Sequence, residues 1–424
     1  MDIIVKAAEL SEGPMTGGER LMAVRLSAMM LVEFIVFGSW FATLGLVLAT
    51  HGGESIIGKA YLLSAVAAIV SPLFMGAIGD RYLAPRNLMA LLHAVGAVAI
   101  GAVPAALQAG EFGLTLGLIF LHMTFFQPTL GLVNSIALTQ LDRHQRLFPY
   151  VRVFGPLGWV VAGLCVGGLG LSASTGVFYI AAGSAALLAV YSLTLPYSPP
   201  PSAGAHISLG DLVGVRALVL FRDRRFAVLM ACTLLTSISL GFYNTFASPY
   251  IAALGISNVA GVLALGQISE VAFIVTIPWV LVRIGMKRAL LLGMGMWGVR
   301  FALFILAAQG MPAMAVVGVA LHGICNDYFI VIAAMFIARL ATPELAAQAQ
   351  GWLILMISGF GAAIGSALSG SIYGAFVAGD PAHGVAGWTP LWLLPMGLAL
   401  LTSVIWTLLF PPGEEQSTAT RTAL

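Results

Sequence analysis

Hydrophobic residues occur along this chain in long runs, and short segments between the runs hold most of the charged side chains. Runs of about 20 apolar residues are long enough for an α-helix to cross a bilayer. A helix suits that environment because backbone groups in lipid need internal hydrogen-bond partners. The pattern predicts an all-α membrane protein with twelve transmembrane helices, at roughly 25–49, 57–79, 88–107, 112–138, 150–171, 173–195, 226–254, 258–281, 289–309, 312–340, 347–378 and 386–410.

The longest polar interval, 196–225, divides these spans into six and six. The predicted domains are an N-terminal six-helix bundle (1–195), a cytoplasmic linker with an amphipathic helix (196–225), a C-terminal six-helix bundle (226–411) and a cytoplasmic tail (412–424). A weak repeat supports two halves, since a proline, a glycine seven residues later and a basic turn follow both the second and the eighth span. This organisation suggests the major facilitator architecture, with a substrate site between the halves.

Composition excludes other classes of protein. Hydrophobic residues make up 60% of the 424 residues and charged residues only 8%, whereas a soluble protein has about 25% charged residues. A net charge of +2 gives no electrostatic case for binding nucleic acid. Three scattered cysteines form neither a disulfide framework nor a metal-ligand spacing, so we expect no cofactor and no metal.

The basic residues predict the orientation in the membrane. Among the loops after odd-numbered spans, only Lys59 is basic. The other loops and the two tails hold Lys6, Arg20, Arg25, Arg81, Arg86, Arg143, Arg146, Arg216, Arg222, Arg224, Arg225, Arg283, Lys287, Arg288, Arg339 and Arg421. By the positive-inside rule, both termini and the loops after even-numbered spans are cytoplasmic.

Two acidic residues inside predicted spans are candidates for proton transfer. A charged residue at the centre of a membrane helix costs roughly 2.5–3.5 kcal/mol on insertion scales, so it should face a cavity or a partner. Glu270 lies mid-span and shares a helix face with Gln267, three residues earlier. Asp327 lies in the tenth span, near His322. A carboxyl group in a partly dry cavity can bind and release a proton near neutral pH.

Other polar residues in spans leave alternatives open. Arg152 is either a cytoplasmic anchor or a central cation, and Glu33 faces either a cavity or the inner surface. His322 lines the cavity or hydrogen-bonds a neighbouring carbonyl. Arg300 is interpreted as a member of a structural ion pair. Trp159 could stack on a planar ligand if its ring faces the cavity.

Segments spread over most of the chain resemble the bacterial nucleoside:proton symporters of the major facilitator superfamily. They are Phe37-Gly38-Ser39-Trp40, Thr43-Leu44-Gly45, Pro128-Thr129-Leu130-Gly131-Leu132-Val133-Asn134-Ser135, Arg152 with Gly155 and Gly158, Gln267-Ile268-Ser269-Glu270, Thr276-Ile277-Pro278, Arg300-Phe301-Ala302-Leu303-Phe304, Asp327 with Phe329, and Gln350-Gly351. The resemblance implies that Arg152 and Gln267 bind nucleoside, and that Glu270 and Asp327 couple transport to protons.

The sequence departs from that family at several expected substrate contacts. Pro156 stands in place of a threonine, Trp159 in place of a phenylalanine, His322 in place of a tyrosine and Asn326 in place of an aromatic residue; in the seventh span, an ungapped alignment puts Tyr243 where the family's polar pair would lie, with Asn244 beside it. The predicted substrate-binding residues are Arg152, Trp159, Asn244, Gln267, Glu270, His322, Asn326 and Asp327.

The sequence therefore predicts proton-coupled uptake of nucleosides across a bacterial inner membrane by alternating access. The alternative is a proton symporter of the same fold for a sugar, a glycoside or another small polar metabolite. An intramembrane enzyme is not expected, because the chain contains neither H-E-x-x-H nor G-x-S-x-G. A receptor built on a transporter fold is a further alternative. The expected partners are a small polar substrate, protons and membrane lipid, with the protein a monomer.

Overall fold

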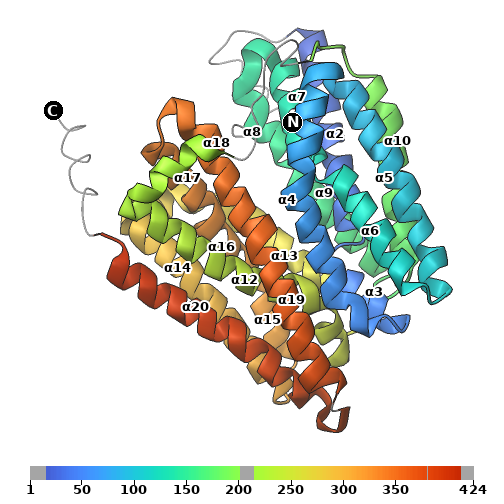
Figure 1. Cartoon of the computed structure of the whole chain (residues 1–424), viewed down its shortest axis with the longest axis vertical. Coiled ribbons are helices and arrows are strands. Elements are labelled where there is room, and N and C mark those ends of the chain that lie inside the picture. Colours follow the sequence, from blue (N-terminus) through green and yellow to red (C-terminus); the bar gives the residue numbers. More distant parts are fainter. Residues whose placement is uncertain (1–15, 201–213, 380, 412–424) are drawn as a thin grey trace. The chain divides into compact units, whose positions relative to one another are not determined.

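The computed structural model describes residues 16–200, 214–379 and 381–411, and within them the backbone forms helices and no β-strand (Figure 1). The amphipathic helix predicted in the linker, at Leu209–Phe221, falls only in part on 201–213, which lie outside the described residues, as does the predicted tail at 412–424. The described end of the linker is a 3₁₀ helix, η3 (Val215–Arg222).

Two compact units divide the chain, and each is described by itself. Unit 1 comprises Met1–Ile207 and Thr245–Gln267, and unit 2 comprises Ser208–Asn244 and Ile268–Leu424. The helices α12 (Arg224–Ala253) and α13 (Val259–Ile274) therefore contribute residues to both units. The division into domains predicted from the sequence remains a prediction.

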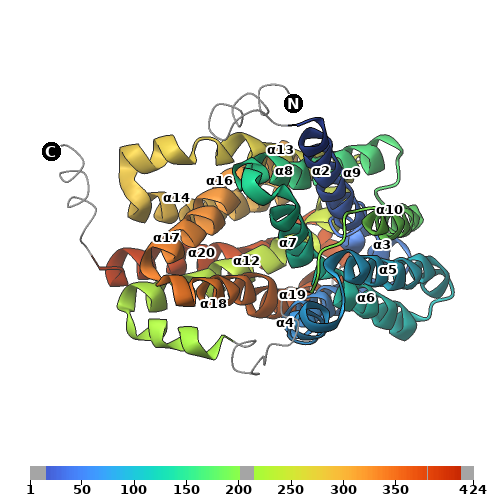
Figure 2. The same ribbon diagram turned by 90° about the horizontal axis from the view of Figure 1, so that it is seen from above.

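Unit 1 is a bundle in which α2 packs against α9 and α10, and α5 packs against α6 and α10 (Figure 2). Its helices are α2 (Gly17–Gly38), α3 (Leu44–Thr50), η1 (Glu54–Ile56), α4 (Ile57–Tyr82), α5 (Pro85–Gln108), α6 (Phe112–Phe126), α7 (Thr129–Leu141), η2 (Asp142–Leu147), α8 (Phe148–Arg152), α9 (Phe154–Gly168) and α10 (Gly176–Leu193). A Cβ atom at Gly158 of α9 would overlap the carbonyl group of Leu31, so this glycine permits the close approach of α9 to α2.

Unit 2 is built around α14, which packs along α20 and against the turn that follows α16. Besides η3 and the first part of α12, its helices are α14 (Ile277–Ala308), α15 (Ala313–Ala320), α16 (His322–Asn326), η4 (Asp327–Val331), α17 (Ile332–Leu340), α18 (Pro343–Ile354), η5 (Leu355–Gly361), α19 (Ala362–Tyr373), η6 (Gly374–Ala378), η7 (Pro381–Trp388) and α20 (Thr389–Leu409). Three of these, η4, η5 and η6, are π-helical turns, so the predicted tenth and eleventh spans are not uniform α-helices.

The twelve predicted spans correspond to eleven long apolar helices in the described residues and to the shorter α13. The predicted eighth span, 258–281, is broken once. It is interrupted after α13 at Val275–Thr276, and Pro278 lies in the first turn of α14. Beyond that span, Gly285 has a non-helical φ of 76° and ψ of 167°, which separate two helices within α14. A conformation with positive φ favours glycine. The predicted loop at 282–288 therefore falls on a break between two helices.

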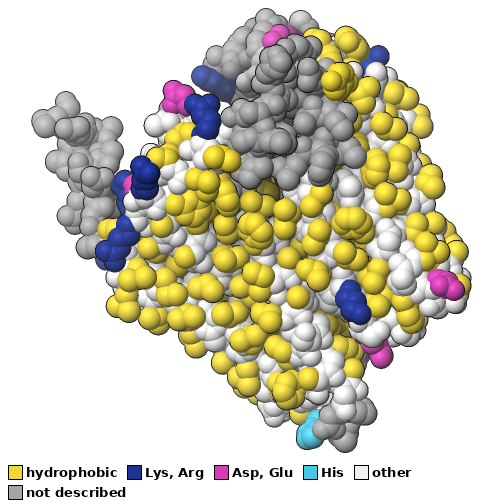
Figure 3. All heavy atoms as spheres, viewed as in Figure 1, with side chains coloured by type: hydrophobic (Ala, Val, Ile, Leu, Met, Phe, Trp, Pro, Cys, Tyr) yellow, Lys and Arg dark blue, Asp and Glu magenta, His cyan; other side chains and the backbone are white. Residues whose placement is uncertain are grey.

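The surface agrees with a protein that lies in lipid. Hydrophobic side chains cover most of the face shown in Figure 3. Large apolar side chains are widely exposed, among them Val98 at 76%, Val282 at 87% and Leu408 at 72%. A soluble monomer rarely exposes such a continuous apolar surface, so the structure confirms the predicted class of all-α membrane protein.

Candidate functional site

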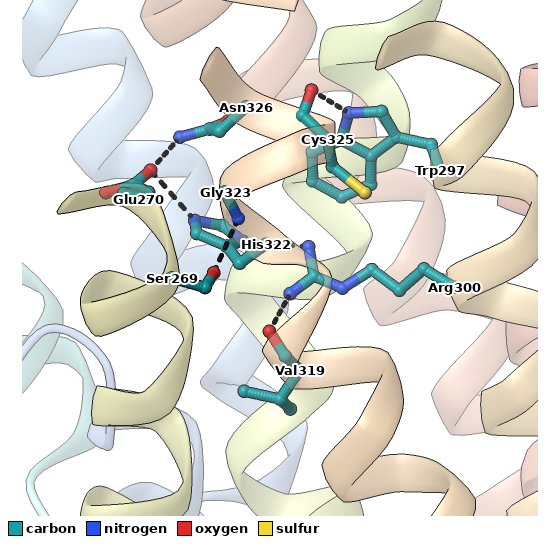
Figure 4. A network of polar contacts seen from close by, with 9 residues as sticks. All are labelled: Ser269, Glu270, Trp297, Arg300, Val319, His322, Gly323, Cys325 and Asn326. Atoms are coloured by element: carbon teal, nitrogen blue, oxygen red, sulfur yellow. Dashed lines mark hydrogen bonds and ion pairs between the residues drawn. The ribbon is translucent and has the colours of Figure 1, made fainter. Parts of the chain in front are cut away.

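The candidate site in unit 2 begins where α13 and α16 touch. The backbone N–H of Gly323 donates a hydrogen bond to the hydroxyl oxygen of Ser269, with 2.7 Å between the two atoms (Figure 4). A Cβ atom at residue 323 would overlap the carbonyl group of Ser269 and the backbone nitrogen of Glu270. The glycine therefore permits a backbone contact that brings Glu270 of α13 beside the polar side chains of α16.

Three titratable side chains contact one another in turn beside this point, and they come from α14, α16 and α13. Nη1 of Arg300, on α14, lies 2.8 Å from Nδ1 of His322. Nε2 of the same imidazole lies 3.3 Å from Oε1 of Glu270. Arg300 is completely buried, and the side chains of His322 and Glu270 are 6% and 16% exposed. The histidine thus connects a buried cation to a nearly buried carboxyl group (Figure 4).

Hydrogen-bond chemistry assigns the proton on this histidine. A guanidinium group only donates hydrogen bonds, so Nδ1 of His322 accepts from Arg300. The imidazole proton then lies on Nε2, from which it is directed at Glu270. A second proton on the ring would place an N–H against the guanidinium. The geometry therefore selects a neutral His322.

Asn326 is the second donor to Glu270. Its Nδ2 atom lies 2.5 Å from Oε1 of Glu270, one turn of helix beyond His322. Both donors converge on the same carboxyl oxygen, and they come from α16 while the acceptor comes from α13. This arrangement suits an ionised Glu270, because a carboxylate oxygen accepts more than one hydrogen bond.

Asp327 follows directly and begins the π-helical turn η4. The residue is 5% exposed, and its Oδ2 atom is buried with no hydrogen-bond partner within the part of the chain that the structure describes. An unpaired buried carboxylate is costly, so such a group is held as the neutral acid or meets a ligand. Single π-helical turns inside α-helices occur frequently at functional sites.

Aromatic rings surround the cation of this site. Cζ of Arg300 lies 3.7 Å from the centre of the Tyr243 ring and 5.0 Å from that of Trp297. Tyr243 also stacks on His322, with 5.3 Å between ring centres and an interplanar angle of 29°. The indole N–H of Trp297 donates to the carbonyl of Cys325 at 3.1 Å. The rings therefore fix both Arg300 and the imidazole that it contacts.

Arg152 and Trp159 lie in unit 1, as does Gln267. Arg152 is at the end of α8, partly buried, with Cζ 4.8 Å from the centre of the Phe34 ring. Trp159, on α9, packs edge-on against Phe37 at 4.9 Å between ring centres. The contact places Arg152 against an aromatic ring of α2, and its role as a central cation remains a prediction.

The two remaining residues, Asn244 and Gln267, are partly buried on α12 and α13. Neither has a hydrogen bond or ion pair among the contacts of the described residues. The structure thus brings Glu270, His322, Asn326 and, next along the chain, Asp327 together, and it leaves Asn244 and Gln267 without a defined polar contact.

Arg300 and Tyr243 belong to the site although they are absent from the predicted set. Arg300 was expected to belong to an ion pair, and its hydrogen-bonded partner is instead His322. The signal in the sequence was the depth of Arg300, because a charge in mid-span needs a partner. The departure from the family at Tyr243 was a second signal. Its stacking on Arg300 could not be read from the sequence, because the two residues are far apart in the chain.

A bundle of membrane-length helices that buries carboxyl groups beside histidine and asparagine is the arrangement of a proton-coupled secondary transporter. Comparison with known proteins identifies the branch. The family model described as "Nucleoside H+ symporter" matches residues 21–415. The chain belongs to this family.

Curated relatives match over nearly the whole chain. The putative nucleoside transporter YegT of Escherichia coli K12 is 33% identical over 410 residues, which cover 93% of this chain and 95% of that protein. The xanthosine permease of the same organism is 31% identical over 405 residues, covering 91% and 94%. The nucleoside permease NupG, also of Escherichia coli K12, is 28% identical over 411 residues, covering 92% and 96%.

Solved structures confirm the fold. The crystal structure of the nucleoside transporter NupG superposes with a TM-score of 0.81 at 25% identity, covering 92% of this chain and 100% of that one. A D-xylose-proton symporter shares the fold at 12% identity, with a TM-score of 0.71 over 92% of this chain and 98% of that one. The predicted major facilitator fold and the prediction of a transporter rather than an enzyme are thus confirmed.

Proposed function

We propose that this chain carries nucleosides across a bacterial inner membrane together with protons, by alternating access and with both termini in the cytoplasm. Membership of the nucleoside H+ symporter family supports the class of substrate. The observation that carries the coupling is Glu270, a nearly buried carboxyl group held by two donors from another helix.

The hydrogen-bond donors of α16 suggest the order in which the proton and the substrate bind. While Glu270 is ionised, its Oε1 atom accepts hydrogen bonds from the side-chain N–H groups of His322 and Asn326. A proton on the carboxyl group removes the charge that holds them, since hydrogen bonds to charged acceptors are roughly twice as strong as neutral ones. Both donors then become available to oxygen and nitrogen atoms of a substrate. Proton binding therefore precedes nucleoside binding.

The other proposed contacts divide by chemistry. Arg152, Asn244 and Gln267 supply hydrogen bonds to a ribose or a base, and Trp159 offers an aromatic ring for a planar base. Asp327 is the second proposed proton-coupling residue, because its buried Oδ2 atom has no partner among the described residues. The proposed assembly is a monomer of two six-helix bundles in lipid, with no nucleic acid as partner.

A sugar, glycoside or other polar metabolite is the second candidate substrate. It is favoured by the polar residues His322 and Asn326 at positions where the resemblance leads us to expect aromatic ones, because amide and imidazole groups suit a ligand rich in hydroxyls. A thermal-shift panel that compares uridine, inosine and xanthosine with pentoses and glycosides separates the two. Stabilisation by sugars alone would overturn the nucleoside proposal.

The decisive experiment is uptake of labelled uridine or inosine by proteoliposomes, with and without an inward proton gradient. We expect accumulation above equilibrium only with the gradient, and its loss in Glu270→Gln with some exchange of uridine remaining. Glu111→Gln, at an exposed position outside the site, is the matched control. Uphill uptake by Glu270→Gln at the wild-type rate would refute the assignment of Glu270.

A further inference from the structure

A second buried acid lies in unit 1. Glu33, on α2, is completely buried. Its Oε2 atom lies 2.8 Å from Nε2 of His93, on α5, and its Oε1 atom lies 2.5 Å from the hydroxyl oxygen of Thr129, the first residue of α7. Three helices thus converge on one carboxyl group.

The hydroxyl of Thr129 makes two short contacts but has one proton. It lies 2.5 Å from Oε1 of Glu33 and 2.6 Å from the carbonyl oxygen of Phe126. O–H···O hydrogen bonds have lengths of about 2.5–3.0 Å, so each contact calls for a proton between its oxygens. A carbonyl oxygen and an ionised carboxylate only accept. A proton on Glu33 supplies the second of these protons.

With a proton on Glu33, each hydrogen bond of this cluster has one donor and one acceptor. A protonated Glu33 donates from Oε1 to the Thr129 oxygen, and Thr129 donates to the Phe126 carbonyl. The other carboxyl oxygen, Oε2, accepts from an N–H at Nε2 of His93. These hydrogen bonds form because α6 ends at Phe126. The side chain of Thr129 therefore reaches back across the break at Gln127–Pro128.

The cation next to this acid is Arg152, a proposed substrate ligand. Arg152 lies over the ring of Phe34, the residue after Glu33, and is close enough to attract an ionised Glu33. The remaining elements packed on α2 add no charge here, because α7, α9 and α10 contain no Asp, Glu, Lys, Arg or His. The next titratable group is His122 on α6, which bonds the Gly96 carbonyl at 2.9 Å and interacts with His93.

We propose that Glu33, with His93 and Thr129, is a second proton-binding site, and that its charge controls whether Arg152 is available to the substrate. When the O–H bond of Glu33 breaks, the proton passes to water and the negative charge stays on the carboxylate, where it attracts Arg152. When Glu33 is neutral, as the geometry indicates here, Arg152 is free of that attraction. The role of Arg152 rests on the proposed function, whereas the proton on Glu33 does not.

Infrared difference spectroscopy of the full chain in liposomes tests the proton directly. A protonated carboxyl group has a C=O stretching band, and we expect the wild type near neutral pH to show one that Glu33→Gln removes. Thr129→Val should shift this band and Thr129→Ser should restore it, because only the serine keeps the hydroxyl. Spectra of wild type and Glu33→Gln that superpose would overturn the proposal, since Glu33 would then be ionised.

The number of protons moved per uridine tests the link to transport. With a pH-sensitive dye inside proteoliposomes, Glu33→Gln should carry one proton fewer per labelled uridine than the wild type, and Glu111→Gln should match the wild type. An unchanged ratio in Glu33→Gln would overturn the link to Arg152. Failure of the wild type to take up uridine would instead overturn the proposed function, and the infrared result would still decide the proton site.

Discussion

Replacing His322 by phenylalanine removes the connection between Arg300 and Glu270 while the ring that stacks on Tyr243 is kept. Two hydrogen bonds are lost, a short one to the buried guanidinium and a longer one to the carboxyl group. A hydrogen bond to a charged group contributes about 1.5–3 kcal/mol and an ordinary one about 1 kcal/mol. We expect His322→Phe to lower the free energy of unfolding by about 3 kcal/mol, a change on the order of 100-fold in the folding equilibrium.

The matched variant is His322→Gln. A glutamine can accept from Arg300 with its amide oxygen and donate to Glu270 with its amide nitrogen, which reproduces the neutral imidazole without a titratable group. Denaturant titration in mixed micelles should show His322→Gln within about 1 kcal/mol of wild type, and uridine uptake should fall far less than in His322→Phe. If both variants lose stability and uptake equally, a neutral connecting His322 is refuted.

Three further predictions concern the same units. Gly323→Ala should destabilise the protein by about 1–3 kcal/mol in the same titration, because a Cβ atom there overlaps Ser269; Gly351→Ala, in open space on α18, is the control, and equal effects would contradict the close contact. Asp327→Asn should leave the unfolding midpoint unchanged or raised while uphill uridine uptake is lost, and retained proton-driven uptake would remove Asp327 from the coupling. Phe34→Leu should weaken uridine binding by a factor of about 3–10, measured by calorimetry, because the ring under Arg152 is lost; an unchanged affinity would show that the ring does not position Arg152.

The apolar periodicity predicted the fold because spans in lipid must be long, helical and free of charge. It failed within the eighth span, which is interrupted at Val275–Thr276. It also missed the π-helical turns at Asp327 and Leu355, since hydrophobic runs do not reveal a change in the number of residues per turn.

For the candidate site, the sequence identified which groups were costly to bury, and so it predicted Glu270 and Asp327 as site residues. It could not predict their partners. The pairing of Arg300 with His322 depends on how α14 meets α16, and the pairing of Glu33 with His93 depends on how α2 meets α5. Such contacts join residues far apart in the chain, and one sequence carries little information about them.

The contact between Ser269 and Gly323 limits how unit 2 can move during transport. Two helices whose backbones touch, with a hydrogen bond across the contact, have no room to slide past one another. Glu270 and the donors of α16 should therefore travel as one rigid body when the protein changes the side to which it opens. Spin labels on the ends of α13 and α16 would then report a constant separation throughout the cycle, and the hinges should be sought elsewhere, at the bend of Gly285 or in the π-helical turns.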